Sequence, residues 1–126
     1  MMGPAVLVVE DVPQIRATAV QLFQELGCEV FDAYNGYDAL KILEAHPEIQ
    51  VLFTDVCMPG MRGPELAQVA RRLRPDLRIV LTSGYVGKEH VLDDTPFVPK
   101  PWCAGDLIGV VRPAPTKKEW SPGRAA

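Results

Sequence analysis

Three carboxylates in the sequence can form one acidic site. Asp55 follows a short apolar run at residues 51–54, and an earlier run, at residues 5–9, ends in Glu10 and Asp11. If both runs are neighbouring strands of a parallel sheet, their carboxyl ends bring the three acids to one edge. Carboxylates at such distances repel and raise each other's proton affinity unless a cation or a basic side chain offsets the charge. The sequence therefore predicts a hard cation bound through oxygen, such as Mg²⁺.

The elements that position these acids follow from the hydrophobic pattern. The run at residues 5–9 is too short for a helix and does not alternate, which is typical of a strand covered on both faces. Asp11 is a candidate N-cap, and Pro13 suits the first turn of a helix that continues until Gly27. The pattern further predicts strands over residues 29–33, 51–54, 77–81 and 97–98, and helices from Asn35-Gly36 to about Ala45, from Pro64 to Arg74 and over residues 104–111.

Strands that alternate with helices predict an α/β fold, with helices on both faces of a parallel sheet. Ligands of such sheets gather at the carboxyl ends of the strands. The residues 113–126 contain three prolines and no apolar periodicity, so we expect a flexible tail after a domain that spans residues 1–112. The candidate site residues all lie at the predicted strand ends: Glu10, Asp11, Asp55, Ser83 and Lys100.

The composition is typical of a soluble globular protein with a single domain. Of the 126 residues, 48% are hydrophobic and 23% are charged, and the net charge is −3, so we expect no nucleic-acid partner. The three cysteines show neither Cys-x-x-Cys spacing nor nearby paired histidines, which argues against disulfides and zinc. No signal peptide or membrane-spanning run is apparent. We therefore expect a cytoplasmic protein without a membrane partner.

Four separated motifs occur in an order that is more specific than any one of them. They are Val-Val-Glu10-Asp11, Phe-Thr-Asp55-Val-Cys-Met-Pro-Gly, Thr-Ser83-Gly and Lys100-Pro101, and Asn35-Gly36 before a helix agrees with them. With these motifs the chain resembles the receiver domains of two-component response regulators, the CheY-like family, over roughly residues 5–112. The resemblance implies a doubly wound, flavodoxin-like (βα)5 fold with a five-stranded parallel sheet in the order 2-1-3-4-5.

The resemblance also implies a phosphorelay function. Asp55 would accept a phosphoryl group from a phosphohistidine of a sensor histidine kinase or a histidine phosphotransfer protein. Magnesium would be held by Glu10, Asp11, Asp55 and the backbone carbonyl of Cys57. The chain would then be a signalling phosphoprotein that takes part in its own phosphoryl transfer and dephosphorylation, not an enzyme, and a homodimer is left open.

Two further residues are implied to contact the phosphoryl group. Lys100 would pair with Asp55 and then with the phosphoryl oxygens, and a hydroxyl would donate to the same group, because phosphoryl transfer depends on charge neutralisation. Adjacent hydroxyls on a strand end point in opposite directions. The glycine after Ser83 matches the small residue that follows the family's hydroxyl, so we predict Ser83 for this role and a structural role for Thr82.

Three other side chains are candidates for reporting on the site or controlling access to it. The family places an aromatic residue three positions before the lysine, here Phe97, which turns inward when Ser83 moves; a core phenylalanine is the alternative. Tyr85 could cover the site. Cys57 has no basic neighbour to activate its thiol, so its side chain would shape access to Asp55.

The segment between Ser83 and Lys100 is shorter than in a usual receiver. Only residues 88–92 could wind into a helix, so we expect a shortened or missing fourth helix. The family commonly signals through this region, so the usual output surface would be changed. The stretches Leu-Thr-Ser-Gly-Tyr and Pro-Lys-Pro-Trp resemble hybrid histidine kinase receivers, and both a stand-alone receiver and a piece of such a kinase are left open.

Two other functions compete with this interpretation. The first is a Mg-dependent phosphatase or phosphotransferase of haloacid-dehalogenase type with an aspartyl nucleophile, but such enzymes carry a second aspartate where this chain has Cys57. The second is a binding module that keeps the fold without phosphorylation. Retention of all five site residues argues against it, because an idle site would tolerate the loss of such a repulsive cluster.

Overall fold

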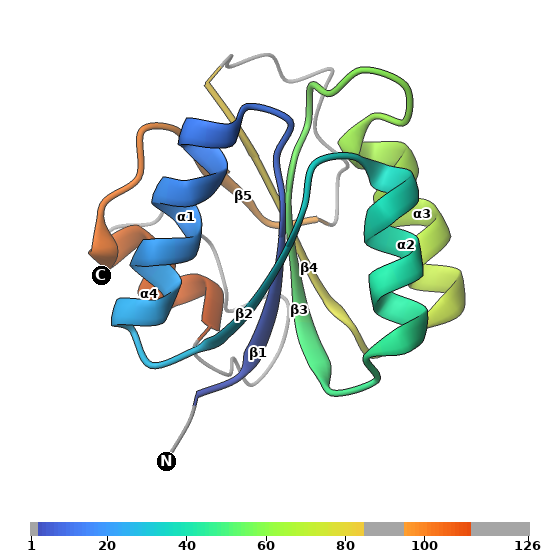
Figure 1. Ribbon diagram of the computed structural model, residues 1–126, viewed down its shortest axis with the longest axis horizontal. Coiled ribbons are helices and arrows are strands. Elements are labelled where there is room, and N and C mark those ends of the chain that lie inside the picture. Colours follow the sequence, from blue (N-terminus) through green and yellow to red (C-terminus); the bar gives the residue numbers. More distant parts are fainter. Residues whose placement is uncertain (1–2, 85–94, 112–126) are drawn as a thin grey trace.

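The computed structural model describes residues 3–84 and 95–111, which form one parallel sheet with helices on both faces (Figure 1). The strands run in the order β2-β1-β3-β4-β5, so the predicted fold class and strand order are confirmed. The strands are β1 (Ala5–Val9), β2 (Glu29–Ala33), β3 (Ile49–Asp55), β4 (Arg78–Ser83) and β5 (Phe97–Pro99). The helices of the described residues are α1 (Pro13–Glu25), α2 (Gly36–Ala45), α3 (Gly63–Leu73) and α4 (Ala104–Val111).

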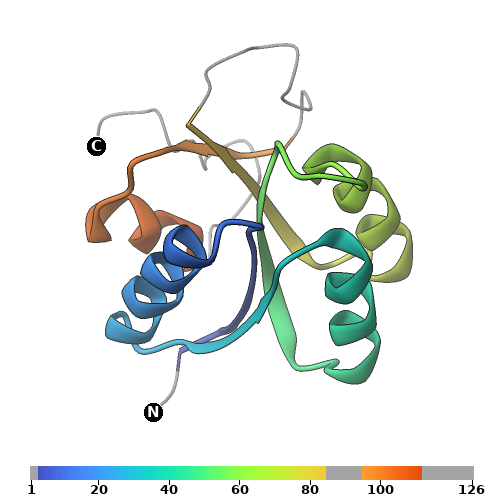
Figure 2. The ribbon, with the colours of Figure 1, turned by 45° about the horizontal axis from the view of Figure 1, so that its top comes forward.

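Two hydrophobic cores lie on opposite faces of the sheet. Helices α1 and α4 cover one face, and α2 and α3 cover the other (Figures 1 and 2). Because side chains alternate along a strand, Val6 and Val8 of β1 pack in the first core, while Leu7 and Val9 pack in the second. A strand buried on both faces needs apolar side chains at every position, which explains the continuous apolar run of β1.

The beginning of α1 differs from the sequence expectation. The N-cap residue is Val12, no side chain caps the helix, and Pro13 occupies its first turn. The backbone N–H of Val12 donates to Glu10 Oε2 over 3.2 Å. The prediction that Asp11 caps α1 is therefore wrong, because the helix begins one residue later, with Val12 as its N-cap residue.

Strands β3 and β4 extend further toward the site than the apolar runs suggest. Asp55 is the last residue of β3 and is paired in register with Thr82 of β4, and β4 continues to Ser83. The site residues on these strands are thus fixed by the backbone hydrogen bonds of a parallel ladder. This gives them a more rigid support than a loop would give.

Some predictions fall on residues outside the described ranges. These are the shortened fourth helix over residues 88–92, Tyr85, and the tail over residues 113–126. The helix labelled α4 is the one predicted over residues 104–111, and its bounds are confirmed. Among residues 3–84 and 95–111, no helix has the length and apolar character needed to cross a membrane.

Candidate functional site

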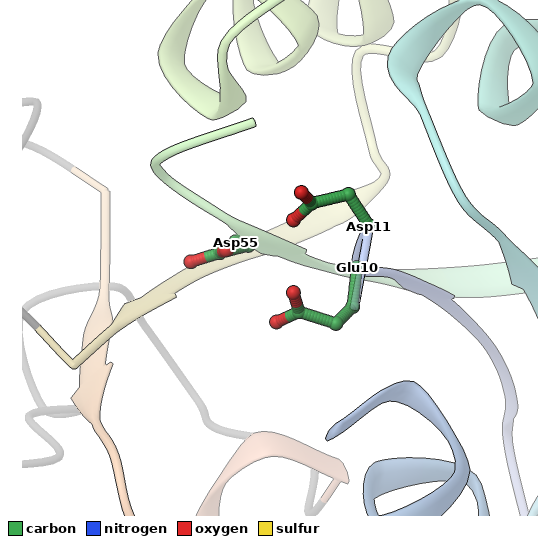
Figure 3. A group of neighbouring side chains, drawn as sticks. All are labelled: Glu10, Asp11 and Asp55. Carbon is green, nitrogen blue, oxygen red and sulfur yellow. The ribbon is translucent and has the colours of Figure 1, made fainter. Parts of the chain in front are cut away.

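The carboxyl ends of β1 and β3 bring the three predicted acids together. Val9 pairs with Thr54 in the β1–β3 register, so the residues that follow each strand emerge at the same edge. One carboxylate oxygen from each of Glu10, Asp11 and Asp55 lies within 4.8 Å of the others. Figure 3 shows these three side chains gathered at the strand ends. They form a donor set of hard oxygens that suits a divalent cation.

Two of these carboxylates are almost completely buried. Glu10 is 2% exposed and Asp55 is 5% exposed, while Asp11 is half-buried. Burial raises the pKa of Glu10, and the charge of Asp55 adds to this rise. Burial also raises the pKa of Asp55, Lys100 opposes the rise, and the charge of Asp11 adds to it. The ionised cluster is therefore unfavourable by itself and is stabilised by added positive charge.

Lys100 provides part of that positive charge. Its ammonium donates to Glu10 Oε1 over 2.7 Å and lies 3.4 Å from Asp55 Oδ1. The sequence interpretation pairs Lys100 with Asp55; in the structure the ammonium lies between the two acids and closer to Glu10. The backbone N–H of Lys100 donates to the carbonyl of Ser83 over 3.0 Å, and the Lys100–Pro101 peptide bond is cis.

The two hydroxyl residues at the end of β4 have different surroundings. The indole N–H of Trp102 donates to Thr82 Oγ1 over 2.8 Å, which fits the structural role expected for Thr82. Ser83 is the last residue of β4 and is 3% exposed. Its assignment to the phosphoryl group stays a prediction. Trp102 is a site neighbour that the sequence reasoning missed, although its position directly after Lys100-Pro101 was a usable signal.

Arg16 is a second residue that the sequence reasoning missed. Its Nη1 donates to the backbone carbonyl of Glu10 over 2.9 Å, and its Nε pairs with Asp32 Oδ2 over 3.1 Å. The guanidinium therefore ties the end of β1 to β2 and to α1. Its sequence signal is weak, because a single arginine in a helix is usually a solvated side chain.

The loop from β3 to α3 returns closely to Asp55. At Gly63 an added Cβ would collide with the backbone carbonyl oxygen of Asp55, and the Gly63 N–H donates to the carbonyl of Val56 over 3.0 Å. Only a glycine allows this approach. The exposed Cys57 lines, with Met58, Pro59 and Arg62, an open cavity of about 300 Å³ on this loop.

Phe97, the predicted reporter residue, is in β5 and pairs in register with Leu81 of β4. Its side chain is half-buried. This placement agrees with both interpretations made from the sequence, a core phenylalanine and a residue that changes position. Its reporting role stays a prediction.

The comparisons with known proteins agree with this geometry. The family model for the response regulator receiver domain matches residues 6–112. The chain belongs to the response regulator receiver domain family. The receiver prediction from the four motifs is therefore confirmed, and the chain is a phosphoacceptor receiver domain of two-component signal transduction. These findings give no support to the haloacid-dehalogenase alternative.

Individual relatives include both large kinases and small receivers. The chain is 33% identical over 114 residues to the sensor kinase CckA of Brucella abortus, a match that covers 85% of this chain and 12% of that kinase. It is 31% identical to the response regulator receiver protein CpdR of the same organism, covering 84% and 92%. The crystal structure of the receiver domain from the hybrid histidine kinase CckA superimposes with a TM-score of 0.71 at 35% identity, covering 82% and 91%.

Proposed function

We propose that Asp55 is the residue of this receiver that accepts the phosphoryl group. The observation that carries the proposal is its position at the end of β3, where a buried carboxylate lies 3.4 Å from the Lys100 ammonium and next to a pair of acids. The donor would be a phosphohistidine of a sensor histidine kinase or of a histidine phosphotransfer protein. Similarity to the CckA and CpdR receivers supports this class of partner.

The transfer follows from the groups around Asp55. A carboxylate oxygen of Asp55 forms a new P–O bond while the P–N bond to the donor imidazole breaks, and the imidazole nitrogen keeps the electron pair. Negative charge spreads over the transferred oxygens. The ammonium of Lys100 neutralises part of this charge, and the hydroxyl of Ser83 donates to one oxygen. Hydrolysis by water would later return Asp55 to a free carboxylate, so the domain takes part in its own reactions without being an enzyme for another substrate.

We also propose Mg²⁺ as the cofactor of this site. The three carboxylates supply hard oxygen ligands, the backbone carbonyl of Cys57 would add a fourth, and receivers of this family generally bind Mg²⁺ at an acidic pocket. A bound Mg²⁺ would supply positive charge at the phosphoryl oxygens. The raised pKa values of Glu10 and Asp55 support this assignment, because burial disfavours their ionised forms and a bound cation would stabilise them.

The proposal extends to the residues around the site. Phe97 and Ser83 would report phosphorylation to the surface, and Tyr85 and Cys57 would control access to the site. The receiver would occupy residues 1–112, in a cytoplasmic protein that binds neither nucleic acid nor membrane. The relatives support both a hybrid kinase receiver and a stand-alone receiver, and a homodimer is compatible with either.

A mass measurement tests the role of Asp55. Incubation with acetyl phosphate and Mg²⁺ is expected to add one phosphoryl group to the wild-type chain, and Asp55→Asn is expected to abolish this addition because the amide is a poor nucleophile. Asp76→Asn is the matched control, since Asp76 is exposed between α3 and β4. A phosphoryl group on the Asp55→Asn variant would reject Asp55 as the acceptor, and its absence from the wild type would favour a binding module.

A further inference from the structure

One aromatic side chain connects the segments that carry Ser83 and Lys100. The indole Nε1–H of Trp102 donates to Thr82 Oγ1 over 2.8 Å, one residue before Ser83. The ring centroid of Trp102 lies 5.7 Å from Lys100 Nζ, within the range of a cation–π contact. Trp102 therefore contacts both the register partner of Asp55 on β4 and the ammonium that lies beside Asp55.

The ring of Trp102 is itself held by the core under α1 and α4. It packs edge-on against Phe53, with ring centroids 5.5 Å apart, and Phe53 packs edge-on against Phe23 at 5.2 Å. Phe53 and Phe23 are 1% and 0% exposed. Edge-to-face contacts of this kind fix ring orientation. The Trp102 ring is therefore packed against this core while its indole N–H reaches β4.

A second attachment joins the same two segments. The backbone N–H of Lys100 donates to the carbonyl of Ser83 over 3.0 Å, and this bond acts beside the one from Trp102 to Thr82. The chain between β5 and α4 is thus held to the end of β4 at two points. A lysine side chain is long and flexible. The Trp102 ring limits the positions open to the Lys100 ammonium, which favours its place between the two carboxylates.

We propose that Trp102 is a positioning residue for phosphoryl transfer, holding the Lys100 ammonium at the acceptor carboxylate. The assignment rests on the proposed function, in which Asp55 accepts the phosphoryl group and Lys100 neutralises its charge. Trp102 acts through Lys100, by the ring contact and by the hydrogen bond to Thr82. Its contribution must therefore disappear when the ammonium is removed.

A double-mutant cycle tests this dependence. Trp102→Phe keeps a ring against Phe53 and removes the indole N–H. With acetyl phosphate and saturating Mg²⁺, we expect this change to slow phosphoryl incorporation about 2- to 10-fold, the effect of one positioning hydrogen bond. In the Lys100→Met background we expect no further slowing. Equal slowing in both backgrounds, or none in either, would overturn the assignment.

Variants at the acceptor of the hydrogen bond provide an independent check. Thr82→Val removes the acceptor with little change in shape, so it should reproduce the slowing of Trp102→Phe and add nothing to it in the double variant. Gln21→Leu is the control, because Gln21 is exposed and its side-chain amide donates within α1 to Glu25 Oε2. If the slowing by Thr82→Val added fully to that by Trp102→Phe in the double variant, the two residues would not act through their shared hydrogen bond, and the assignment would be contradicted.

Fluorescence gives a readout that does not require a change at Trp102. The chain has two tryptophans, so Trp120→Phe leaves Trp102 as the sole emitter. Beryllofluoride with Mg²⁺, a phosphoryl mimic, should change the Trp102 emission when Lys100 is present and not in Lys100→Met. Unchanged emission in both would overturn the assignment.

The outcomes separate this inference from the proposed function. A wild type that takes no phosphoryl group rejects both together, whereas normal phosphorylation rates in Trp102→Phe reject the inference alone.

Discussion

At the scale of residues, the site holds three acids close together and one lysine beside two of them. Glu10 and Asp55 are both buried, and burial is the main cause of their raised pKa values. Lys100 is close to both acids. A buried acid near like charge destabilises the folded protein when it is ionised. The residues that make the site reactive therefore also reduce its stability.

The first stability prediction concerns Asp55 and pH. Because its pKa is raised on folding, the folded protein binds more protons than the unfolded chain between the two pKa values. The favourable contribution of Asp55 is complete below its unfolded pKa and is lost as pH rises through the folded pKa. In chelator, the free energy of unfolding of Asp55→Asn should thus rise relative to that of the wild type as pH increases through the folded pKa of Asp55.

Urea unfolding followed by circular dichroism at several pH values measures this difference. Asp76→Asn, which removes an exposed carboxylate, is the control for the loss of one acid. If the free energy of unfolding of the wild type instead rose relative to that of Asp55→Asn as pH increases, the result would contradict the burial argument.

The meeting of the acids is predictable from the sequence, whereas their hydrogen bonds are not. Apolar runs that end in Glu10 and Asp55 must converge in a parallel sheet. In the structure α1 begins after Val12 and Glu10 Oε2 accepts the Val12 N–H, so Asp11 does not cap the helix. Such choices depend on side-chain geometry of a few ångströms, which residue types do not determine.

At the scale of elements, the loop from β3 to α3 is fixed by one close approach. Gly63 opens α3 directly against the Asp55 carbonyl, so the loop that includes Cys57 is held close to the site. The sequence suggests a loop here from its proline and glycines. It does not show which glycine is required by space, because that depends on how α3 returns to β3.

We predict that Gly63→Ala destabilises the protein by about 1 to 3 kcal/mol, the usual effect of overpacking. The added Cβ would displace backbone atoms of Asp55, not the end of a flexible side chain. Urea unfolding is the measurement. Gly105→Ala is the matched control, because a Cβ there meets only the Cys103 sulfur at an ordinary 3.8 Å in α4; an equal loss in both variants would refute the close approach.

At the scale of the whole molecule, the sheet separates two cores, and the site lies over the core of α1 and α4. Phe53 belongs to that core, and Asp55, two residues later, shares its face because strand side chains alternate. The parallel sheet is predictable because short apolar runs such as residues 5–9 alternate with helical patterns, whereas the strand order follows from the family resemblance. The contact of Trp102 with Thr82 is not predictable, because it joins segments whose meeting depends on the packed fold.

The whole fold should gain stability from the cation. A ligand that binds only the folded state stabilises it by about 2.7 kcal/mol at a concentration 100 times its dissociation constant, so Mg²⁺ should raise the melting temperature of the wild type at neutral pH. K⁺ at matched ionic strength is the control. If beryllofluoride bound as tightly in chelator as in Mg²⁺, Glu10 and Asp11 would not hold the metal.

The ammonium between Glu10 and Asp55 also sets the valence of the ion that suits this edge of the sheet. Three ionised carboxylates and one ammonium within contact distance leave two negative charges. A divalent ion brings that local sum to zero, whereas a monovalent ion leaves an excess of negative charge. Loss of the Lys100 charge, by substitution or by lysine acetylation, would leave three negative charges and shift the preference of the site toward trivalent ions.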